Sequence, residues 1–394
     1  MLTTETLPAL QQALADAKLD GWLLFDFQGT NPIVAGLLGI KGFITRRIFV
    51  WIPREGVPHA LGHAIERGPW ETWPAAWTKA PYSSWKSLES AVAAMVKGKR
   101  IAMEYSAGDA VPYLDRIPAG VIEMVRSAGA EVVSSGQLVT QFYAVWTPGN
   151  VASHDRSAEI IATVAKDAFK MIGERARTSS PATEFEMMQW ILGRFKASGL
   201  ETDHGPNVSA GPNTADSHYE PTKEKSRKIG ENEVVLIDLW ATDKHGVHPY
   251  ADQTWMAYTG KPTAKVTQVW EAVRDARDAA ITLVVDSAAK KVRIPGGAAD
   301  DAARKVITDR GFGQYFTHRT GHSIDSRELH GSGPHLDNLE TREERLLIPG
   351  VGFSIEPGIY MWGEFGMRSE VNVYITDERA VVTPREPQRE LFLV

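Results

Sequence analysis

Residues 234–258 read VVLIDLWATDKHGVHPYADQTWMAY, and they decide how the second half of the chain folds. Two apolar runs rich in β-branched and aromatic residues flank a polar stretch, which predicts two strands joined by a turn. Each run carries one aspartate, Asp238 in the first and Asp252 in the return strand. A carboxylate inside an apolar strand needs a partner, because burying an unpaired charge is very unfavourable. The stretch therefore predicts a β-hairpin in which each of the two acids has a partner.

Other candidates for a polar site follow along the chain. Residues 315–335, YFTHRTGHSIDSRELHGSGPH, hold four histidines, and eight of the eleven histidines lie between His204 and His335. Glu356 sits in FSIEPG, and Glu370 sits in MRSEVNVYI with Arg368 two residues before it. Taken singly, each of these acids is as readily explained by a structural role as by metal binding, such as pairing in the core, ending a strand or forming a plain ion pair. A lone histidine is more often a buried residue with its hydrogen bonds satisfied than a ligand. Four carboxylates in strand signals with one histidine suit one or two divalent ions such as Mn²⁺, Co²⁺ or Zn²⁺.

Helix and strand signals divide the chain into two domains. The first 145 or so residues alternate between helix and strand patterns, which predicts a compact α/β domain. The segment FYAVWTPGNVASHDR, residues 142–156, reads as a linker with a proline and a glycine. After it come long amphipathic helices and a mostly antiparallel set of strands, a pattern typical of an α+β domain. We place the domains at 1–148 and 152–394.

Composition excludes several classes of protein. The 394 residues are 43% hydrophobic and 23% charged, which is a globular profile. The net charge is −6, and the sequence has no cluster of basic residues of the kind that binds nucleic acid. The absence of cysteine excludes disulfides, thiolate catalysis and Cys-ligated zinc. The first residues lack a basic and an apolar region of a signal peptide, and no apolar run reaches membrane-spanning length. These observations predict a soluble, cytoplasmic protein.

The order Asp, Asp, His, Glu, Glu resembles the metallopeptidases of the pita-bread fold, family M24. That family includes methionine aminopeptidase, aminopeptidase P and Xaa-Pro dipeptidase (prolidase). The resemblance is carried by the segments IDLWATDKHGVHPYADQTW, HRTGHSI, FSIEPGIY and GMRSEVNVYIT, and by SAGPNTADSHYEPT ahead of them. It implies an α+β pita-bread catalytic domain, preceded by a smaller α/β domain like that of the prolidase and creatinase branch.

The resemblance also implies roles for individual residues. Two divalent ions are expected, with Mn²⁺ first and Co²⁺ or Zn²⁺ as alternatives, holding a bridging hydroxide. The implied metal ligands are Asp238, Asp252, His322, Glu356 and Glu370. The implied catalytic residues are His218, His330 and Glu356, and the residues expected to touch substrate are His218, His330, His335 and Arg368. Arg368 is expected either to orient Glu370 or to meet the substrate's carboxylate, and His318 either to line the pocket or to lie behind a metal ligand.

Three departures from the family pattern bear on these roles. Asp238 and Asp252 lie fourteen positions apart, three more than usual, which predicts a longer hairpin tip where His245 and His248 are extra candidates or a solvated loop. His322 and His330 are eight apart, one more than usual, and Ser323 replaces the usual glycine. The carboxylate-binding arginine of some prolidases has no evident counterpart. His335 stands near its place, and we expect it at the rim of the pocket.

The resemblance implies hydrolysis of a peptide bond whose nitrogen belongs to proline. The first domain resembles that of the proline-specific branch, whereas methionine aminopeptidases manage without it, and the modest length favours dipeptides. Aminopeptidase P, acting on longer peptides, and another amide hydrolase of this fold remain alternatives. The intact ligand set argues against a creatinase-like hydrolase and against a non-enzymatic binding module. Relatives with this first domain are often homodimers, so we expect a homodimer.

Overall fold

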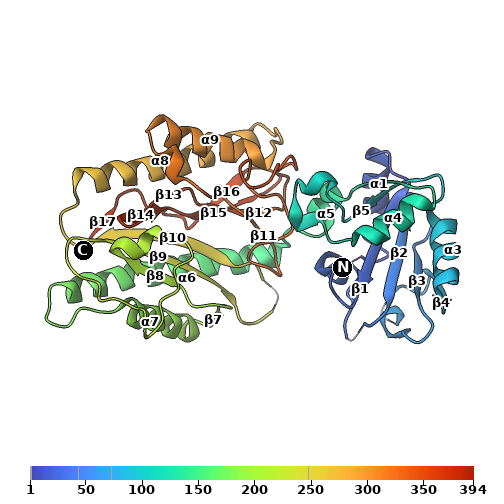
Figure 1. The fold of residues 1–394 in the computed structure, drawn as a ribbon, viewed down its shortest axis with the longest axis horizontal. Helices are drawn as coiled ribbons and strands as arrows, with labels where there is room; N and C mark the ends of the chain where they lie inside the picture. The colour runs from blue at the N-terminus through green and yellow to red at the C-terminus, as the bar shows by residue number, and fades with distance from the viewer. Residues whose placement is uncertain (1, 43, 72, 247) are drawn as a thin grey trace. The chain divides into compact units, whose positions relative to one another are not determined.

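The computed structural model describes residues 2–42, 44–71, 73–246 and 248–394. The chain divides into two compact units, residues 1–143 and 144–394 (Figure 1). Each unit has its own sheets and its own hydrophobic core. Among the described residues, no helix combines the length and the apolar character needed to cross a membrane.

The first unit is a six-stranded sheet with helices on both faces. The strand order is β4-β3-β2-β1-β5-β6, in which β1 pairs antiparallel with β2 and parallel with β5. Its helices and strands are α1 (Leu7–Asp16), β1 (Gly21–Phe27), α2 (Pro32–Leu38), β2 (Arg47–Pro53), β3 (His59–His63), η1 (Gly68–Trp70), β4 (Thr78–Tyr82), α3 (Trp85–Val96), β5 (Arg100–Met103), η2 (Ala107–Asp109), η3 (Pro112–Leu114), α4 (Ala119–Ser127), β6 (Glu131–Ser134) and α5 (Gly136–Phe142). The predicted α/β character of this part is confirmed.

Alternation along β1 explains the two covered faces. Successive side chains of a strand point to opposite faces. Trp22 and Leu24 belong to a core shared with α1, α2 and α5, whereas Leu23 and Phe25 belong to a core shared with α3 and α4. A strand buried on both sides reads as a continuous apolar run, which is why WLLFDF shows no polar alternation.

Glu104 lies in the first unit with no exposed surface. Its carboxylate accepts hydrogen bonds from Trp22 Nε1, Asn31 Nδ2 at 3.1 Å and Ser135 Oγ at 3.3 Å. Burial raises its pKa to about 7, although these donors oppose the shift. Because the folded state holds this proton more tightly than the unfolded state, the free energy of unfolding falls as pH rises from about 4.5 through 7.

We predict that Glu104→Gln removes this part of the pH dependence. The free energy of unfolding of the variant, relative to that of the native protein, should rise by about 3 kcal/mol between pH 4.5 and pH 8. This follows from about 1.4 kcal/mol per pKa unit. Urea unfolding of both full chains at several pH values measures the difference. A constant difference across that range would show that Glu104 is ionised at no cost. Glu131→Gln, at an exposed carboxylate, is the control and should show no such gain.

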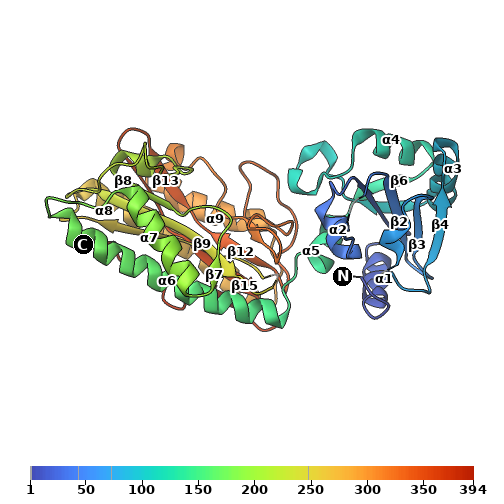
Figure 2. The same cartoon turned by 90° about the horizontal axis from the view of Figure 1, so that it is seen from below.

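The second unit consists of three groups of strands between two pairs of helices, and all strand pairs are antiparallel except β10 with β17 (Figures 1 and 2). One sheet has the order β17-β10-β9-β7 with β8 also paired to β9, a second has the order β11-β12-β15-β16, and β13 pairs with β14. The elements are α6 (Pro148–Ala176), α7 (Glu184–Ala197), β7 (Leu200–Glu201), β8 (Asn207–Ala210), η4 (Gly211–Ala215), β9 (Val234–Asp243), β10 (Ala251–Tyr258), α8 (Ala264–Ala289), α9 (Gly296–Asp309), η5 (Gly313–Tyr315), β11 (Ser323–Ile324), β12 (Gly352–Ile355), β13 (Gly358–Met361), β14 (Phe365–Arg368), β15 (Val371–Ile375), β16 (Ala380–Thr383) and β17 (Phe392–Leu393). The expected α+β class is confirmed.

The β9–β10 hairpin separates two cores. Ile237, Leu239 and Trp255 pack with α6 and α7 on one face. Leu236 and Met256 pack on the other face with residues of α8, β12 and β15. Asp238 has the same parity as Leu236, so it points to the second face, toward the interior between the sheets. This alternation places the acids of the hairpin inside the unit.

One expectation about a boundary is confirmed only in part. The division between the two units falls inside the segment 142–156, after residue 143, but α6 already begins at Pro148, where Thr147 caps it by accepting from Asn150 N in a capping box. The polar run that suggested a loop forms the first turns of this helix. The segment MRSEVNVYIT is two strands, since β14 ends at Arg368 and β15 begins at Val371. The chain changes partner strand there, and Glu370 lies at the break.

Candidate metal centre

The hairpin supplies two acids at neighbouring positions of one sheet face. In the antiparallel register of β9 and β10, Asp238 stands opposite Thr254 and Asp252 stands opposite Trp240. Residues opposite each other in such a pair share a face, and so do residues two apart. Asp238, Asp252 and Thr254 therefore face the interior together. The predicted hairpin is confirmed, and its register places both acids on one side.

Three further candidates, His322, Glu356 and Glu370, lie near these acids and next to strands of the other sheet. Asp252, His322 and Glu370 offer ligand atoms that all lie within 4.8 Å of one another, and these three residues are buried. His322 Nε2 lies 3.2 Å from Asp252 Oδ2 and 3.4 Å from Glu356 Oε1. The structure thus brings together Asp252 of β10 and three residues next to strand ends: His322 before β11, Glu356 after β12 and Glu370 before β15.

Arg368 and Thr254 tie Asp238 to this cluster. The guanidinium of Arg368 donates to the Asp238 carboxylate through Nη2 and to Thr254 Oγ1 through Nε at 2.8 Å. Thr254 Oγ1 lies 3.2 Å from Asp238 Oδ1 and 2.8 Å from Glu370 Oε2. Arg368 and Glu370 thus meet at one threonine although they lie in no common strand. Sequence reasoning missed Thr254, which alternation with Asp252 would have placed on this face.

Crowding of the acids shifts their pKa values. Burial, with the charge of Glu356, raises the pKa of Asp252 to about 8. Burial also raises the pKa of Asp238 to about 7 against the opposing charge of Arg368, and raises that of Glu370 well above its ordinary value. Burial acts to raise the pKa of Glu356, but the charges of His322 and Arg368 outweigh it and lower that pKa to about 2. Without further positive charge, the cluster cannot hold all its acids ionised.

The donor set fits divalent cations. Carboxylate oxygens with one imidazole nitrogen suit ions such as Mn²⁺, Co²⁺ or Zn²⁺. Glu370 Oε1 is buried and has no hydrogen-bond partner among the described residues, which leaves a lone pair free for a cation. A hydrogen bond between Ser354 Oγ and Glu356 Oε1 at 2.9 Å fixes another acid of the set. The residues that would hold such ions are Asp238, Asp252, His322, Glu356 and Glu370.

The predicted catalytic histidines lie near this cluster. The ring centroids of His322 and His330 are 4.2 Å apart, and the charge of His322, with loss of hydration, lowers the pKa of His330 to about 3. The side chain of His330 is exposed, and its lowered pKa leaves the imidazole neutral at pH 7, in which form one ring nitrogen is a donor and the other an acceptor. His218 is also exposed, and its charge acts on His330. His318 Nε2 lies 2.9 Å from the hydroxyl of Tyr360, which in turn lies 3.4 Å from Arg368 Nη1.

His335 is not at a pocket rim, so that expectation is wrong. Its side chain has no exposed surface, and its Nδ1 accepts from Ser323 N at 3.4 Å. The chain after His330 folds back under β11, where Leu336 and Gly321 form a bridge. This places His335 beneath the segment that carries His322. The glycine-to-serine departure at Ser323 leaves that backbone in the strand β11.

Buried charges hold the loop that presents His330. Asp325 has no exposed surface and accepts from Arg327 N, Glu328 N and Ser332 N at 2.8, 2.9 and 3.1 Å. Arg345, paired with Glu343, donates to the carbonyl oxygens of Ser332 and Gly333, both at 2.6 Å. Charge-assisted bonds of this kind are stronger than neutral ones. The loop is thus fixed on both sides of His330.

We predict that Asp325→Asn loosens this loop. The amide retains one acceptor oxygen and turns its NH₂ toward Ser332 N, so one buried donor loses its partner at a cost of about 1–3 kcal/mol. Hydrogen exchange of residues 326–334 should quicken by roughly 10- to 100-fold, while exchange in α8 stays unchanged. Equal exchange in both proteins would show that Asp325 does not hold the loop.

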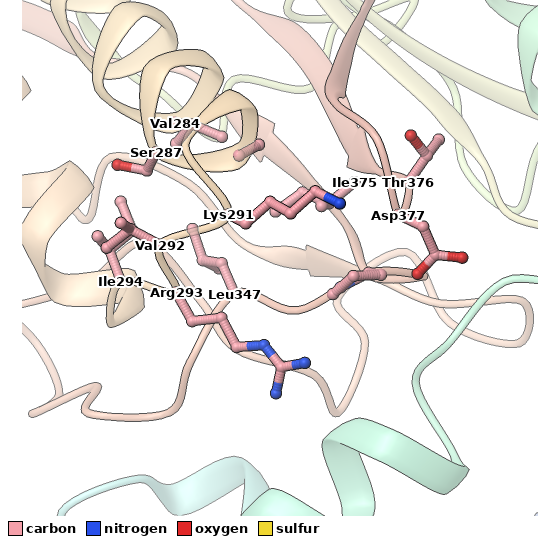
Figure 3. A pocket seen from close by; sticks show the side chains of 12 residues that line it. Val284, Ser287, Lys291, Val292, Arg293, Ile294, Leu347, Ile375, Thr376 and Asp377 are labelled. Carbon is pink, nitrogen blue, oxygen red and sulfur yellow. The ribbon is translucent and has the colours of Figure 1, made fainter.

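The remaining candidates lie elsewhere. His245 N donates to Asp243 Oδ1 at 3.1 Å, and His248 Nε2 lies 3.2 Å from the carbonyl oxygen of His245. Both residues thus belong to the hairpin tip, where the ring of His248 contacts the backbone of His245. A cavity of about 290 Å³ is lined by the end of α8, by the segment 291–294 and by the last residue of β15 with the two residues after it, and Lys291, Arg293 and Asp377 are among the lining residues (Figure 3). None of the five predicted ligands lines that cavity.

Comparison with known proteins identifies the family. Residues 152–377 match the model of metallopeptidase family M24. A probable dipeptidase PepE of Mycobacterium bovis is 32% identical over 188 residues, which cover 48% of this chain and 45% of the relative. A Xaa-Pro dipeptidase of Lactobacillus delbrueckii subsp. lactis is 37% identical over 171 residues, 43% of this chain and 42% of the relative. The matched part thus spans less than half the length of these curated relatives.

Solved structures show the same fold over the whole chain. Dipeptidase PepE from Mycobacterium ulcerans superposes with a TM-score of 0.74 at 24% identity, covering 99% of this chain and 97% of that one. A prolidase from Thermococcus sibiricus superposes with a TM-score of 0.66 at 22% identity, covering both chains fully. The predicted pita-bread unit with a preceding α/β unit is therefore confirmed. With the family match covering more than half of its residues, the chain belongs to metallopeptidase family M24.

Proposed function

We propose that this chain is a metal-dependent exopeptidase that hydrolyses the bond between an amino acid and proline, most readily in dipeptides. The observation that carries the proposal is the buried cluster of Asp252, His322 and Glu370, whose ligand atoms lie within 4.8 Å of one another. The matching relatives named dipeptidase PepE and Xaa-Pro dipeptidase support the substrate class. Two divalent ions, with Mn²⁺ expected, supply Lewis-acid polarisation of the scissile carbonyl and a lowered pKa of the attacking water when bound.

The residues around the cluster have separate tasks in this proposal. Glu356, which lies 3.4 Å from His322 Nε2 in the cluster, accepts the proton of the attacking water. Neutral His330 donates a hydrogen bond to the carbonyl oxygen as negative charge develops on it. His218 acts on the leaving-group side. The contacts of Arg368 with Asp238 and Thr254 support an orienting role toward the acids, one of the two roles expected for it.

Hydrolysis of four peptides tests the proposal. Protein stripped of metal and reloaded with Mn²⁺ is offered Ala-Pro, Ala-Pro-Ala, Ala-Leu and a tripeptide beginning with methionine. Preferred cleavage of Ala-Pro, lost on chelation and restored by Mn²⁺, is the expected result. Preference for Ala-Pro-Ala would make the chain an aminopeptidase P, and cleavage of the methionine peptide alone would move it to the methionine-specific branch. Full activity of the stripped protein would contradict the metal-dependent mechanism.

A dipeptidase without a proline requirement is the second candidate. The Mycobacterium bovis relative is named a probable dipeptidase, and its name does not mention proline. Equal cleavage of Ala-Leu and Ala-Pro would favour this reading. The homodimer and the cytoplasmic location stay predictions.

A further inference from the structure

Strand β8 carries two buried polar side chains without an assigned task. Asn207 is 6% exposed and Ser209 has no exposed surface. Neither Nδ2 nor Oδ1 of Asn207, nor Oγ of Ser209, has a hydrogen-bond partner among the described residues. Buried polar groups in native proteins nearly always have a partner, because an unmade bond is unfavourable. Three such atoms on one short strand indicate a partner that the chain itself does not supply.

The register of β8 places these side chains on the face of the metal centre. Asn207 stands directly opposite Asp238 in the antiparallel pair with β9, and Val208 stands opposite Ile237. Val208 and Ile237 pack into the core beneath α6 and α7. Because side chains alternate along a strand, Asn207 and Ser209 point the other way, to the interior face with Asp238.

Asn207 ends a row of polar residues that crosses three strands. Thr254 of β10, Asp238 of β9 and Asn207 of β8 lie opposite one another in register. Thr254 and Asp238 are satisfied by each other and by Arg368. Neighbouring strands lie about 4.8 Å apart, so Asn207 is one strand beyond Asp238 as seen from β10. A molecule held at Asp252 of β10 and extending across Asp238 reaches Asn207 next.

We propose that Asn207, with Ser209 beside it, is a specificity-determining residue. It hydrogen-bonds the side chain of the substrate residue on the amino side of the cleaved bond, and that side chain is uncharged and carries a hydroxyl or carboxamide. The inference rests on the proposed peptidase function and deepens it.

The hydrogen-bonding groups of Asn207 and Ser209 select this class of side chain. The carboxamide of Asn207 offers both donors and an acceptor. A substrate hydroxyl or carboxamide is itself a donor and an acceptor, so it can bond Nδ2 and Oδ1 together. A cationic side chain would use Oδ1 of Asn207 only and leave Nδ2 unpaired. An anionic one would lie beside the carboxylates of Asp238 and Asp252. An apolar side chain would leave all three buried atoms unpaired, and sites built for hydrogen bonds reject such analogues strongly.

A pair of isosteric substrates tests the inference. Thr-Pro and Val-Pro differ by a hydroxyl in place of a methyl group. The Mn²⁺-loaded protein should cleave Thr-Pro with a kcat/KM at least about tenfold higher than that for Val-Pro. Asn207→Leu should bring the ratio of the two kcat/KM values to within about threefold of one, or reverse it. Val208→Ala, on the same strand but on the opposite face, should keep the native ratio.

Two results would overturn the inference. One is a native protein that cleaves Thr-Pro and Val-Pro equally, and the other is an Asn207→Leu variant that keeps the native ratio. If the melting curve shows that Asn207→Leu does not fold, Asn207→Ala and Ser209→Ala are measured in the same way, and an unchanged ratio in both counts against the inference.

Binding separates this inference from the proposed function. Calorimetry of L-threonine against L-valine on the Mn²⁺-loaded protein requires no turnover. Tighter binding of threonine, lost in Asn207→Leu, without cleavage of any peptide would contradict the proposed function and support only the recognition of a hydroxyl side chain by Asn207. Cleavage of Ala-Pro with equal binding of the two amino acids would support the proposed function and contradict the inference.

Discussion

Asp252→Asn is expected to abolish Mn²⁺-dependent peptide hydrolysis and, at the same time, to raise the melting temperature of the metal-free protein at pH 9. The loss follows because the amide replaces a negative ligand in the cluster of Asp252, His322 and Glu370. Changes in residues behind a ligand already cost about 10–100-fold in metal affinity, so a ligand change should exceed about 100-fold. Calorimetric titration with Mn²⁺ and the hydrolysis of Ala-Pro measure these effects.

The gain in stability follows from the raised pKa of Asp252. Burial and the charge of Glu356 raise that pKa to about 8, so the folded state binds the proton more tightly than the unfolded state. The free energy of unfolding of the metal-free native protein therefore falls as pH rises from the ordinary value of an aspartate through about 8. Asparagine cannot ionise, so the variant avoids this loss. The two melting temperatures should converge below pH 4, where Asp252 is protonated in both states.

Asp243→Asn provides the matched control. Asp243 lies at the end of β9 in the same hairpin and pairs with Arg156 away from the cluster. Its pKa is lowered, chiefly by the backbone hydrogen bond from His245, so its removal should bring no gain in stability at pH 9. Mn²⁺ binding should persist. A metal-free Asp252→Asn protein that melts below the native one at pH 9 would show that the cluster carries no excess of negative charge.

Arg368→Met is expected to destabilise the metal-free protein by about 3–5 kcal/mol, the usual cost of leaving a buried charge without its partner. Arg368 is 5% exposed, and its guanidinium contacts Asp238, Thr254 and Tyr360. Its charge also helps to keep the pKa of Glu356 low. Without it, the acids of the cluster face one another uncompensated. Urea unfolding of both proteins in chelator measures the loss.

Bound Mn²⁺ should reduce that loss substantially, because divalent ions supply the positive charge that the arginine provided. A control at a similarly buried arginine behaves differently. Arg277 is 1% exposed and pairs with Asp278, so Arg277→Met should destabilise the protein to the same extent with and without Mn²⁺. Equal losses for Arg368→Met in chelator and in Mn²⁺ would show that Arg368 serves packing rather than the charge balance of the cluster.

Much of the fold could be read along the chain. The paired apolar runs around Asp238 and Asp252 are a local pattern, and they form the predicted hairpin. Equally local patterns underlie β1, with its apolar run WLLFDF, and the start of α7, where Thr183 and Glu186 form a capping box. One boundary differs, because local signals conflict there. Pro148 and Gly149 suggested a loop, but a proline is well tolerated in the first turn of a helix, and the cap at Thr147 starts α6 there.

Residues with a charge inside an apolar strand marked the site, because burial demands a partner and the alternation of a strand fixes the face. The sequence by itself thus determined the hairpin, the two-unit layout and which acids and histidine could act together. It could not show that Arg368 turns to Asp238, that His335 is buried beneath β11 or that Asn207 stands opposite Asp238. Those facts depend on which strands pair and on where one sheet crosses another. Only the tertiary structure decided them, because contacts between residues more than a hundred positions apart, such as Thr254 with Glu370, leave no periodic signal in the chain.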